Sequence, residues 1–202
     1  MVRYLMEFLR QYIEDKIEID DEEWERVASL FSKKVYVKGE EIFSAGEVHE
    51  NIYYVSEGIL RMYMIDTEGK DITWALNYHK DGQVLDPFSA DYVSYLSQRE
   101  SDIFCEALCD SVVYISTFNA LDRLYESGLK WMRLGKNISD TQIVTLVERT
   151  KMMHRLTAKE KYLLMQNVAP MYEKVLPDYQ FATVLGITPQ SLSRIKKEMK
   201  ED

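Results

Sequence analysis

The chain has 202 residues, 46% of them hydrophobic, which is enough for one large domain or two small domains with a real core. It contains no run of about 18 apolar residues, and its first ten residues form an amphipathic stretch with Glu7 inside, so neither a membrane span nor a signal peptide is expected. The net charge is −9, but residues 149–202 carry ten Lys and Arg against six Asp and Glu, an asymmetry that favours a nucleic-acid-binding end.

Residues 1–31 are predicted to be helical, and the expected N-cap is Asp20 or Asp21. One helical face would carry Trp24, Val27, Ala28 and Phe31. From Lys33 to about Phe118 the pattern changes to short β-rich runs, namely Lys34–Val37, Ile42–Ser44, Ile52–Val55, Ile59–Ile65, Ile72–Leu76 and Val112–Ile115. Turns in which glycine adopts positive φ at little cost are expected at Lys38-Gly39, Ala45-Gly46, Glu57-Gly58, Glu68-Gly69 and Asp81-Gly82. This spacing indicates a β-sandwich or barrel, interrupted by a loosely helical segment over Pro87–Gln98.

A long helix is predicted from Leu129 to about Met153, after a break at Ser127-Gly128. An imperfect seam of residues seven apart is formed by Met132, Ser139, Leu146 and Met153. A second apolar face, expected to pack on the barrel, is formed by Trp131, Ile138 and Val144–Val147. Two buried faces suit a dimer spine, and an ordinary core helix explains the same pattern.

The strongest motif lies between Asp178 and Met199. The positions that a helix-turn-helix requires are held by Phe181, Ala182, Leu185, Gly186, Ile187, Leu192 and Ile195. Ala182 leaves room for the crossing helix, and Gly186 fits the tight turn. Thr188 is the expected N-cap of the second helix, and Pro189 fits its first position. The motif predicts DNA binding, and the alternative is a plain helical hairpin with a solvated basic face.

On the second helix, Leu192, Ile195 and Met199 are spaced to face inward, so Gln190, Ser193 and Arg194 are expected to point outward. Gln pairs bidentately with adenine and Arg with guanine, whereas the later lysines, Lys196, Lys197 and Lys200, suit phosphates. The predicted DNA-binding residues are Thr188, Pro189, Gln190, Ser191, Ser193, Arg194, Lys196 and Lys197. Because the sequence given ends at Asp202, a β-hairpin wing after this helix is expected to be short or absent.

The two ends of the chain fit one family. The segments Lys38-Gly39-Glu40, Ala45-Gly46-Glu47, Tyr53–Tyr63, Glu68-Gly69-Lys70 and Gly82 resemble a cyclic-nucleotide-binding β-roll. With the long helix and the helix-turn-helix, nearly the whole chain resembles the Crp/Fnr superfamily of transcription regulators. Leu156–Tyr162 is similar to the family's run at the start of its DNA-binding domain, and the family's base-reading residues match Gln190, Ser193 and Arg194.

The resemblance implies an α+β fold. Residues 1–128 would form a double-stranded, jelly-roll-like β-roll that acts as the sensor domain, residues 129–153 a dimerisation helix, and residues 154–202 a helix-turn-helix domain. It further implies a homodimer that binds a palindromic operator in double-stranded DNA, and RNA polymerase is a further candidate partner. An effector in the β-roll would shift the two recognition helices through the spine near Thr141-Gln142 and Thr145.

The family's nucleotide-binding residues do not carry over to this chain. Its Gly-Glu pair matches Gly82-Gln83, where an amide replaces the acid, and its Arg-Ser pair falls on Ser101-Asp102, with Arg99 out of register. Asp102 would repel a phosphate, so cyclic AMP is disfavoured as the effector. The expected effector pocket involves Gly82, Gln83, Arg99, Ser101, Asp102, Thr141 and Gln142, and takes an unidentified small molecule or none.

No cofactor chemistry is expected. The three histidines lie far apart in the sequence, and Cys105 and Cys109 have no further cysteine partners, which disfavours a metal site and an iron–sulfur cluster and indicates a reduced, cytoplasmic protein. No Gly-rich phosphate loop and no nucleophile–base arrangement is visible, so we expect a regulator and not an enzyme. The alternative is a ligand-sensing or protein-interaction module whose β-roll domain serves no operator-binding function.

Overall fold

Two short helices open the part of the chain that the computed structural model describes, residues 6–201. The single helix expected over residues 1–31 is divided into α2 (Glu7–Glu14) and α3 (Asp21–Ala28), and residues 1–5 of that prediction lie outside the described residues. Asp20 caps α3, as predicted: its carboxylate accepts a hydrogen bond from the Glu23 N–H at 2.8 Å, and the Glu23 carboxylate accepts one from the Asp20 N–H at 3.1 Å.

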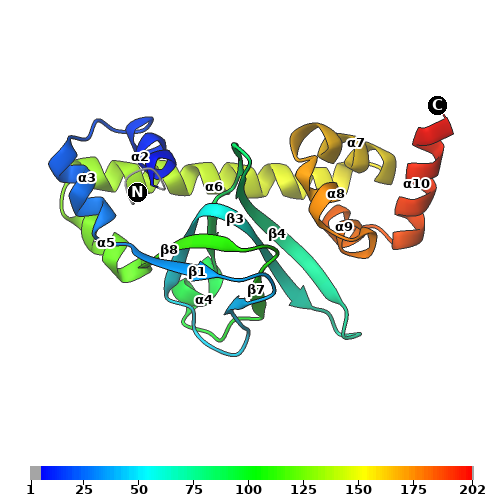
Figure 1. The fold of residues 1–202 in the computed structure, drawn as a ribbon, viewed down its shortest axis with the longest axis horizontal. Coiled ribbons are helices and arrows are strands. Elements are labelled where there is room, and N and C mark those ends of the chain that lie inside the picture. Colours follow the sequence, from blue (N-terminus) through cyan, green and yellow to red (C-terminus); the bar gives the residue numbers. More distant parts are fainter. Residues whose placement is uncertain (1–5, 202) are drawn as a thin grey trace.

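An antiparallel sheet follows and curls into a roll (Figure 1). Its strands are β1 (Ser32–Tyr36), β2 (Glu41–Phe43), β3 (Asn51–Ile65), β4 (Asp71–Lys80), β5 (Gln83–Leu85), β6 (Phe88–Ala90), β7 (Ile103–Ala107) and β8 (Ser111–Thr117). The first half of β3 pairs with β6 and β8, and its second half pairs with β4 and β7. Because one long strand contributes to both faces, the sheet closes into the β-roll that the sequence predicted.

The turn predicted at Glu57-Gly58 is wrong, because β3 runs through this point without reversing. The chain instead forms a bulge here against β8, and Gly58 has φ 117°. A Cβ at this position would lie 2.1 Å from Ser111 Oγ and 2.7 Å from Ser111 Cα. Gly58 therefore allows β3 and β8 to approach closely and permits the bulge in β3. It does not mark the end of a strand.

The turn predicted at Asp81-Gly82 is confirmed. Both residues have positive φ, 53° and 73°, as a two-residue hairpin connection between β4 and β5 requires. The segment Pro87–Gln98 was predicted to be loosely helical, but its first part forms β6, and only α4 (Tyr92–Ser97) is helical. Strands β5 and β6 are three residues long, too short to produce a clear alternating pattern.

The remaining chain is helical, with α5 (Phe118–Glu126), α6 (Leu129–Arg155), α7 (Ala158–Val168), α8 (Met171–Val175), α9 (Asp178–Leu185) and α10 (Pro189–Glu201). Figure 1 shows α6 running from α2, α3 and α5 at one end, past the roll, to α7–α10 at the other end. We call α7–α10 the C-terminal helical module. None of the helices in the described part of the chain is long and apolar enough to span a membrane.

The two predicted faces of α6 are only partly buried. Trp131 and Leu134 are buried in a cluster with residues of α2 and α3, and Ile138 packs against that cluster. Val144 and Val147 were expected to pack on the roll, but they are 61% and 45% exposed, whereas Arg149 of the same helix donates to the Trp74 carbonyl of β4. An apolar face of α6 therefore remains open in the single chain.

Candidate nucleic-acid interface and effector pocket

Helices α9 and α10 form the predicted helix-turn-helix. The residues that fill the space between them, Phe181, Ala182, Leu185, Leu192 and Ile195, are each at most 3% exposed. Gly186 ends α9 in the left-handed conformation with φ 63°, which suits glycine at a helix C-cap. These buried positions of the motif are thus confirmed, whereas Ile187 is only partly buried and Met199, expected to face inward, is 37% exposed.

Gly186 also marks a close approach to the end of α6. A Cβ at this glycine would lie 2.3 Å from Met153 Cε, so the turn fits against the Met153 side chain. The sequence placed Met153 on a dimer seam, whereas the structure directs it to the turn within the same chain. Met153 is half-buried against its own chain, and its place in a dimer seam stays a prediction.

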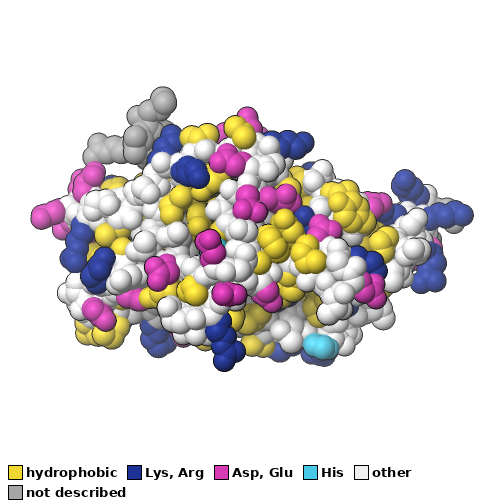
Figure 2. Space-filling model, turned by 90° about the horizontal axis from the view of Figure 1, so that it is seen from below, with side chains coloured by type: hydrophobic (Ala, Val, Ile, Leu, Met, Phe, Trp, Pro, Cys, Tyr) yellow, Lys and Arg dark blue, Asp and Glu magenta, His cyan; other side chains and the backbone are white. Residues whose placement is uncertain are grey.

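The first turn of α10 is open to solvent. Thr188 Oγ1 accepts a hydrogen bond from the Ser191 N–H at 3.2 Å, so Thr188 caps the helix and Pro189 begins it, as expected. The three residues assigned to base contacts, Gln190, Ser193 and Arg194, are all exposed. Figure 2 shows Lys and Arg side chains gathered at the end of the molecule where Figure 1 places α10.

Lys196 differs from its predicted role as a phosphate contact. Its ammonium group lies 2.7 Å from Glu173 Oε1 and 2.6 Å from Asp178 Oδ1, and its side chain is only 21% exposed. These carboxylates raise its pKa, although desolvation acts in the opposite direction. Lys196 therefore links α10 to α8 and α9. Its ammonium group is paired within the module, whereas the sequence predicted a cation free to contact phosphate. Its partners come from other helices, so sequence spacing along α10 gave no sign of them.

The C-terminal helical module covers an edge of the roll. Over residues 71–77, β4 pairs only with β3, because β5 reaches no further than Tyr78. The Thr73 N–H donates to Thr183 Oγ1 at 2.9 Å, and the Leu76 N–H donates to Tyr172 Oη at 3.0 Å. Side chains of α8 and α9 thus satisfy edge donors that would otherwise be left unpaired. No sequence pattern indicated this contact.

Arg61 and two carboxylates form a charged network next to this edge. Arg61, whose side chain is 3% exposed, donates to Thr73 Oγ1 at 2.9 Å, to Glu106 Oε1 at 2.9 Å and to the Asp71 carboxylate. The same Asp71 carboxylate accepts a hydrogen bond from Gln180 Nε2 of α9 at 3.1 Å. The network therefore joins three strands of the roll to the helix that carries the DNA-binding motif.

A cavity of about 900 Å³ lies between the roll, α2, α4 and α6, and we call it the roll–α6 pocket. Four of the predicted effector residues line it: Arg99, Ser101, Asp102 and Gln142. The other three predicted residues, Gly82, Gln83 and Thr141, are not among its lining residues. Gly82 and Gln83 lie at the exposed tip of the β4–β5 hairpin, and the Thr141 hydroxyl donates back to Asn137 O within α6. The predicted pocket is therefore only partly correct.

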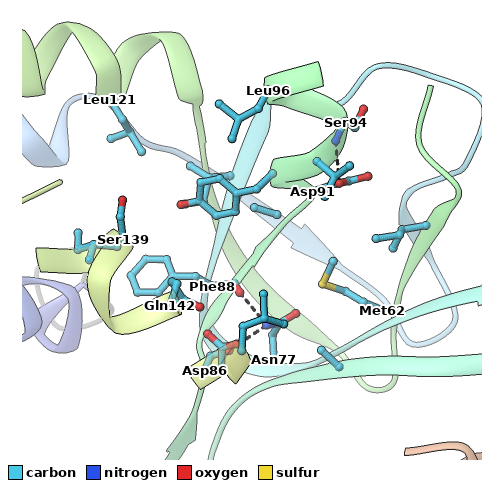
Figure 3. Close-up of a pocket in the computed structure, with 18 of the residues that line it drawn as sticks. Met62, Asn77, Asp86, Phe88, Asp91, Ser94, Leu96, Leu121, Ser139 and Gln142 are labelled. Atoms are coloured by element: carbon cyan, nitrogen blue, oxygen red, sulfur yellow. Dashed lines mark hydrogen bonds between the residues drawn. The ribbon is translucent and has the colours of Figure 1, made fainter. Parts of the chain in front are cut away.

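Ser101 does not offer its hydroxyl to a phosphate. It donates to the buried Asp91 carboxylate at 2.6 Å, and Asp91 also accepts from the Ser94 N–H at 3.0 Å as the N-cap of α4. Figure 3 shows Asp91 and Ser94 at one side of the pocket, with Asp86, Asn77 and Gln142 gathered at the other. A phosphate placed at Ser101 would therefore meet the Asp91 carboxylate, and the expectation that cyclic AMP is disfavoured stays a prediction.

Asp86, Asn77 and Phe88 also belong to the pocket, and sequence reasoning missed them. Asn77 is 1% exposed, and its Nδ2 donates to Asp86 O at 2.9 Å and to Phe88 O at 2.7 Å. Asp86 has φ 40°, an uncommon conformation for a residue other than glycine. The signal in the sequence was weak, a single Asp-Pro pair between two short strands.

Cys105 and Cys109 are both free cysteines. Cys105 is fully buried on β7, and burial raises the pKa of its thiol to about 12. Within residues 6–201, no group of three or more His, Cys, Asp or Glu side chains is arranged to hold a metal ion.

The chain resembles several known proteins in sequence or in fold. No family model matches the sequence. The chain is 27% identical over 175 residues to electron transport regulator A of Shewanella oneidensis, a match that covers 81% of this chain and 66% of that protein. The chain therefore spans just under two thirds of the length of this relative.

Solved structures share the architecture. The chain resembles the c-di-GMP-responsive global regulator CLP of Xanthomonas campestris, with a TM-score of 0.65, 11% identity and coverage of 91% of this chain and 93% of CLP. It also resembles a transcriptional regulator of the Crp/Fnr family from Eubacterium rectale, with a TM-score of 0.62, 14% identity and coverage of 90% and 84%. The chain has the fold of the Crp/Fnr regulators, with a β-roll, a long central helix and a C-terminal helical module. The resemblance deduced from the sequence is confirmed at the level of the fold.

Proposed function

We propose that the protein is a sequence-specific DNA-binding transcription regulator of the Crp/Fnr type, and that it is not an enzyme. The observation that carries this proposal is the first turn of α10, where Gln190, Ser193 and Arg194 are exposed above a fully buried seam with α9. A rigid helix that presents amide, hydroxyl and guanidinium groups at its N-terminal end suits the major groove.

The proposed regulator acts as a homodimer. The apolar residues left open on α6, Ile143, Val144, Leu146 and Val147, are between 45% and 61% exposed in the single chain. A second copy of the same helix would cover them, and a two-fold dimer places two α10 helices for a two-fold-symmetric operator. This apolar surface supports the dimer by the free energy gained when it is removed from water.

The proposed effector site is the roll–α6 pocket. Its walls come from the roll and from α6, so a ligand there would contact both the sensor domain and the proposed dimer helix. Gln142 and Thr145 of α6 line the pocket and belong to the spine through which the two recognition helices would shift. Regulation of this kind requires that the ligand bind two arrangements of the dimer with different affinities.

The test is selection of binding sites from a random pool of double-stranded DNA with the full chain. We expect an enriched two-fold-symmetric sequence. Arg194→Ala should weaken binding to that site by about five- to a hundred-fold and relax selectivity at one base pair per half-site, because a bidentate contact is worth roughly 1–3 kcal/mol.

Lys200→Ala is the matched control, since Lys200 is exposed near the other end of α10. It should weaken binding to selected and unselected DNA equally. If Arg194→Ala leaves affinity for the selected site unchanged while the salt dependence persists, the assignment of base contacts is wrong.

A second candidate function is a ligand-sensing module whose helical module binds a protein. The acidic balance of residues 1–148 motivates it, because most of the molecular surface would repel DNA. No retention of DNA at low salt, together with a stable protein complex that is lost when residues 178–202 are removed, would favour this candidate over the first.

A further inference from the structure

The roll–α6 pocket combines one carboxylate with aromatic walls. Asp86 follows β5, and the rings of Tyr12, Phe88 and Tyr92 line the same cavity. The ring centroids of Tyr12 and Phe88 are 5.5 Å apart. Burial is the main cause that raises the pKa of both Tyr12 and Tyr92, and the charge of Asp86 contributes to both shifts. The rings therefore lie within the electrostatic field of this carboxylate.

Asp86 is accessible through the cavity, yet protein atoms surround it. Desolvation raises its pKa to about 6, while the Phe88 N–H and the charge of Arg149 act in the opposite direction. At neutral pH the Asp86 carboxylate is therefore mainly charged, and the residue keeps exposed surface. Figure 3 shows Asp86 beside Asn77, Phe88 and Gln142, on the side of the pocket next to α6.

The charged groups around the cavity leave Asp86 as an available anion. Arg149 lines the pocket, but its guanidinium donates to the Trp74 carbonyl and lies 4.5 Å from the centre of the Trp74 ring. Asp91 is already occupied by Ser94 and Ser101. Most of the remaining lining is apolar or aromatic, so a ligand with a large apolar body is accommodated.

Asn77 fixes the backbone beside Asp86. Its Nδ2 uses both protons on backbone carbonyls, and its buried Oδ1 has no hydrogen-bond partner among the described residues. Buried acceptors of this kind are rare, because leaving them unpaired costs free energy. The buried Asn77 amide therefore holds the backbone of Asp86 and Phe88 in place at this end of the pocket.

We propose that the pocket binds a small organic cation with an aromatic or branched apolar body, with its ammonium group on Asp86 and its body against Tyr12, Phe88 and Tyr92. An ammonium group gains from a carboxylate and from aromatic faces at the same time. The inference rests on the proposed function only in naming this ligand as the effector. Ligand binding itself is measured without DNA. Failure to retain DNA would therefore contradict the proposed regulator function and leave the pocket assignment unaffected.

The test uses three probes that share one phenethyl body: 2-phenylethylamine, 2-phenylethanol and 3-phenylpropionate. Titration calorimetry on the full chain at pH 7.5 should show binding in the order cation, alcohol, anion, with about tenfold or more between the first and the last. Cyclic AMP is the fourth ligand and should bind more weakly than the cation.

Asp86→Asn is the diagnostic variant, because asparagine tolerates the positive φ at this position and removes only the charge. It should weaken the cation by about tenfold and leave the alcohol unchanged. Asp102→Asn, at another lining carboxylate, is the matched control and should change neither.

Four outcomes would overturn the inference. The first three are tighter binding of the anion or cyclic AMP, equal loss in the two variants, and no binding of the cation at millimolar concentration. A fourth is a weaker self-association of Asp86→Asn in sedimentation, which would assign Asp86 to a partner side chain and not to a ligand.

Discussion

The Tyr172 hydroxyl is the clearest single contact between the C-terminal helical module and the roll. Tyr172→Phe keeps the ring in its cluster but removes the acceptor of the Leu76 N–H, whose residue is 1% exposed. An unpaired buried donor costs roughly 1–3 kcal/mol, against a total stability of about 5–15 kcal/mol for a typical protein. For a chain of this length each kcal/mol lowers Tm by about 2–4 °C.

Urea unfolding followed by far-ultraviolet circular dichroism measures this loss, and amide hydrogen exchange at Leu76 reports it locally. Tyr179→Phe is the matched control, because Tyr179 is 52% exposed and its hydroxyl accepts only from the neighbouring Gln180 side chain at 3.2 Å. The control should change stability by less than about 0.5 kcal/mol. Equal stability of the two variants, or unchanged protection of the Leu76 amide in Tyr172→Phe, would refute the reasoning.

Two further substitutions test contacts that sequence reasoning misread. Gly58→Ala would put a Cβ 2.7 Å from Ser111 Cα at φ 117°, so it should lower the free energy of unfolding by roughly 3 kcal/mol or more, whereas Gly69→Ala, at φ 80° with open space around it, should cost about 1 kcal/mol. A loss at Gly58 no larger than at Gly69, measured by urea unfolding, would contradict the bulge. Lys196→Met should lower stability by about 1 kcal/mol through its two lost carboxylate partners, yet leave the salt dependence of DNA retention unchanged. If the slope of log affinity against log salt concentration becomes shallower by about one, Lys196 contacts a DNA phosphate after all.

The helix-turn-helix could be predicted from the sequence because all its determinants are local. Ala182, Gly186 and Pro189 occupy positions that sterics reserve for a small residue, a left-handed turn and a first helical residue. The buried faces follow from helical periodicity. The ion pairs of Lys196 could not be predicted, because its partner Glu173 lies on another helix and no periodic pattern on α10 encodes that pair.

The pocket was harder to predict, since its walls come from segments far apart in the chain. Tyr12 of α2, Asn77 of β4 and Gln142 of α6 meet only when the roll has closed against the long helix. The family resemblance aligned Gly82 with a ligand-binding glycine. Here Gly82 lies at a hairpin tip, where a Cβ on this residue would meet no atom within 4 Å. The resemblance therefore matched only part of the lining of this cavity, and its role as the effector site stays a proposal.

One strand connects the proposed effector to the proposed DNA-binding helix. On β4, Trp74, Ala75 and Asn77 line the roll–α6 pocket, while the backbone N–H groups of Thr73 and Leu76 hold the C-terminal helical module. Within these five residues, a displacement that follows ligand contact at Asn77 would alter the hydrogen bonds at Thr73 and Leu76. This route is shorter than the spine along α6, and it acts within one chain. By linkage, an operator that favours one placement of the module would change the affinity of the pocket ligand by the same factor as the ligand changes that of the operator.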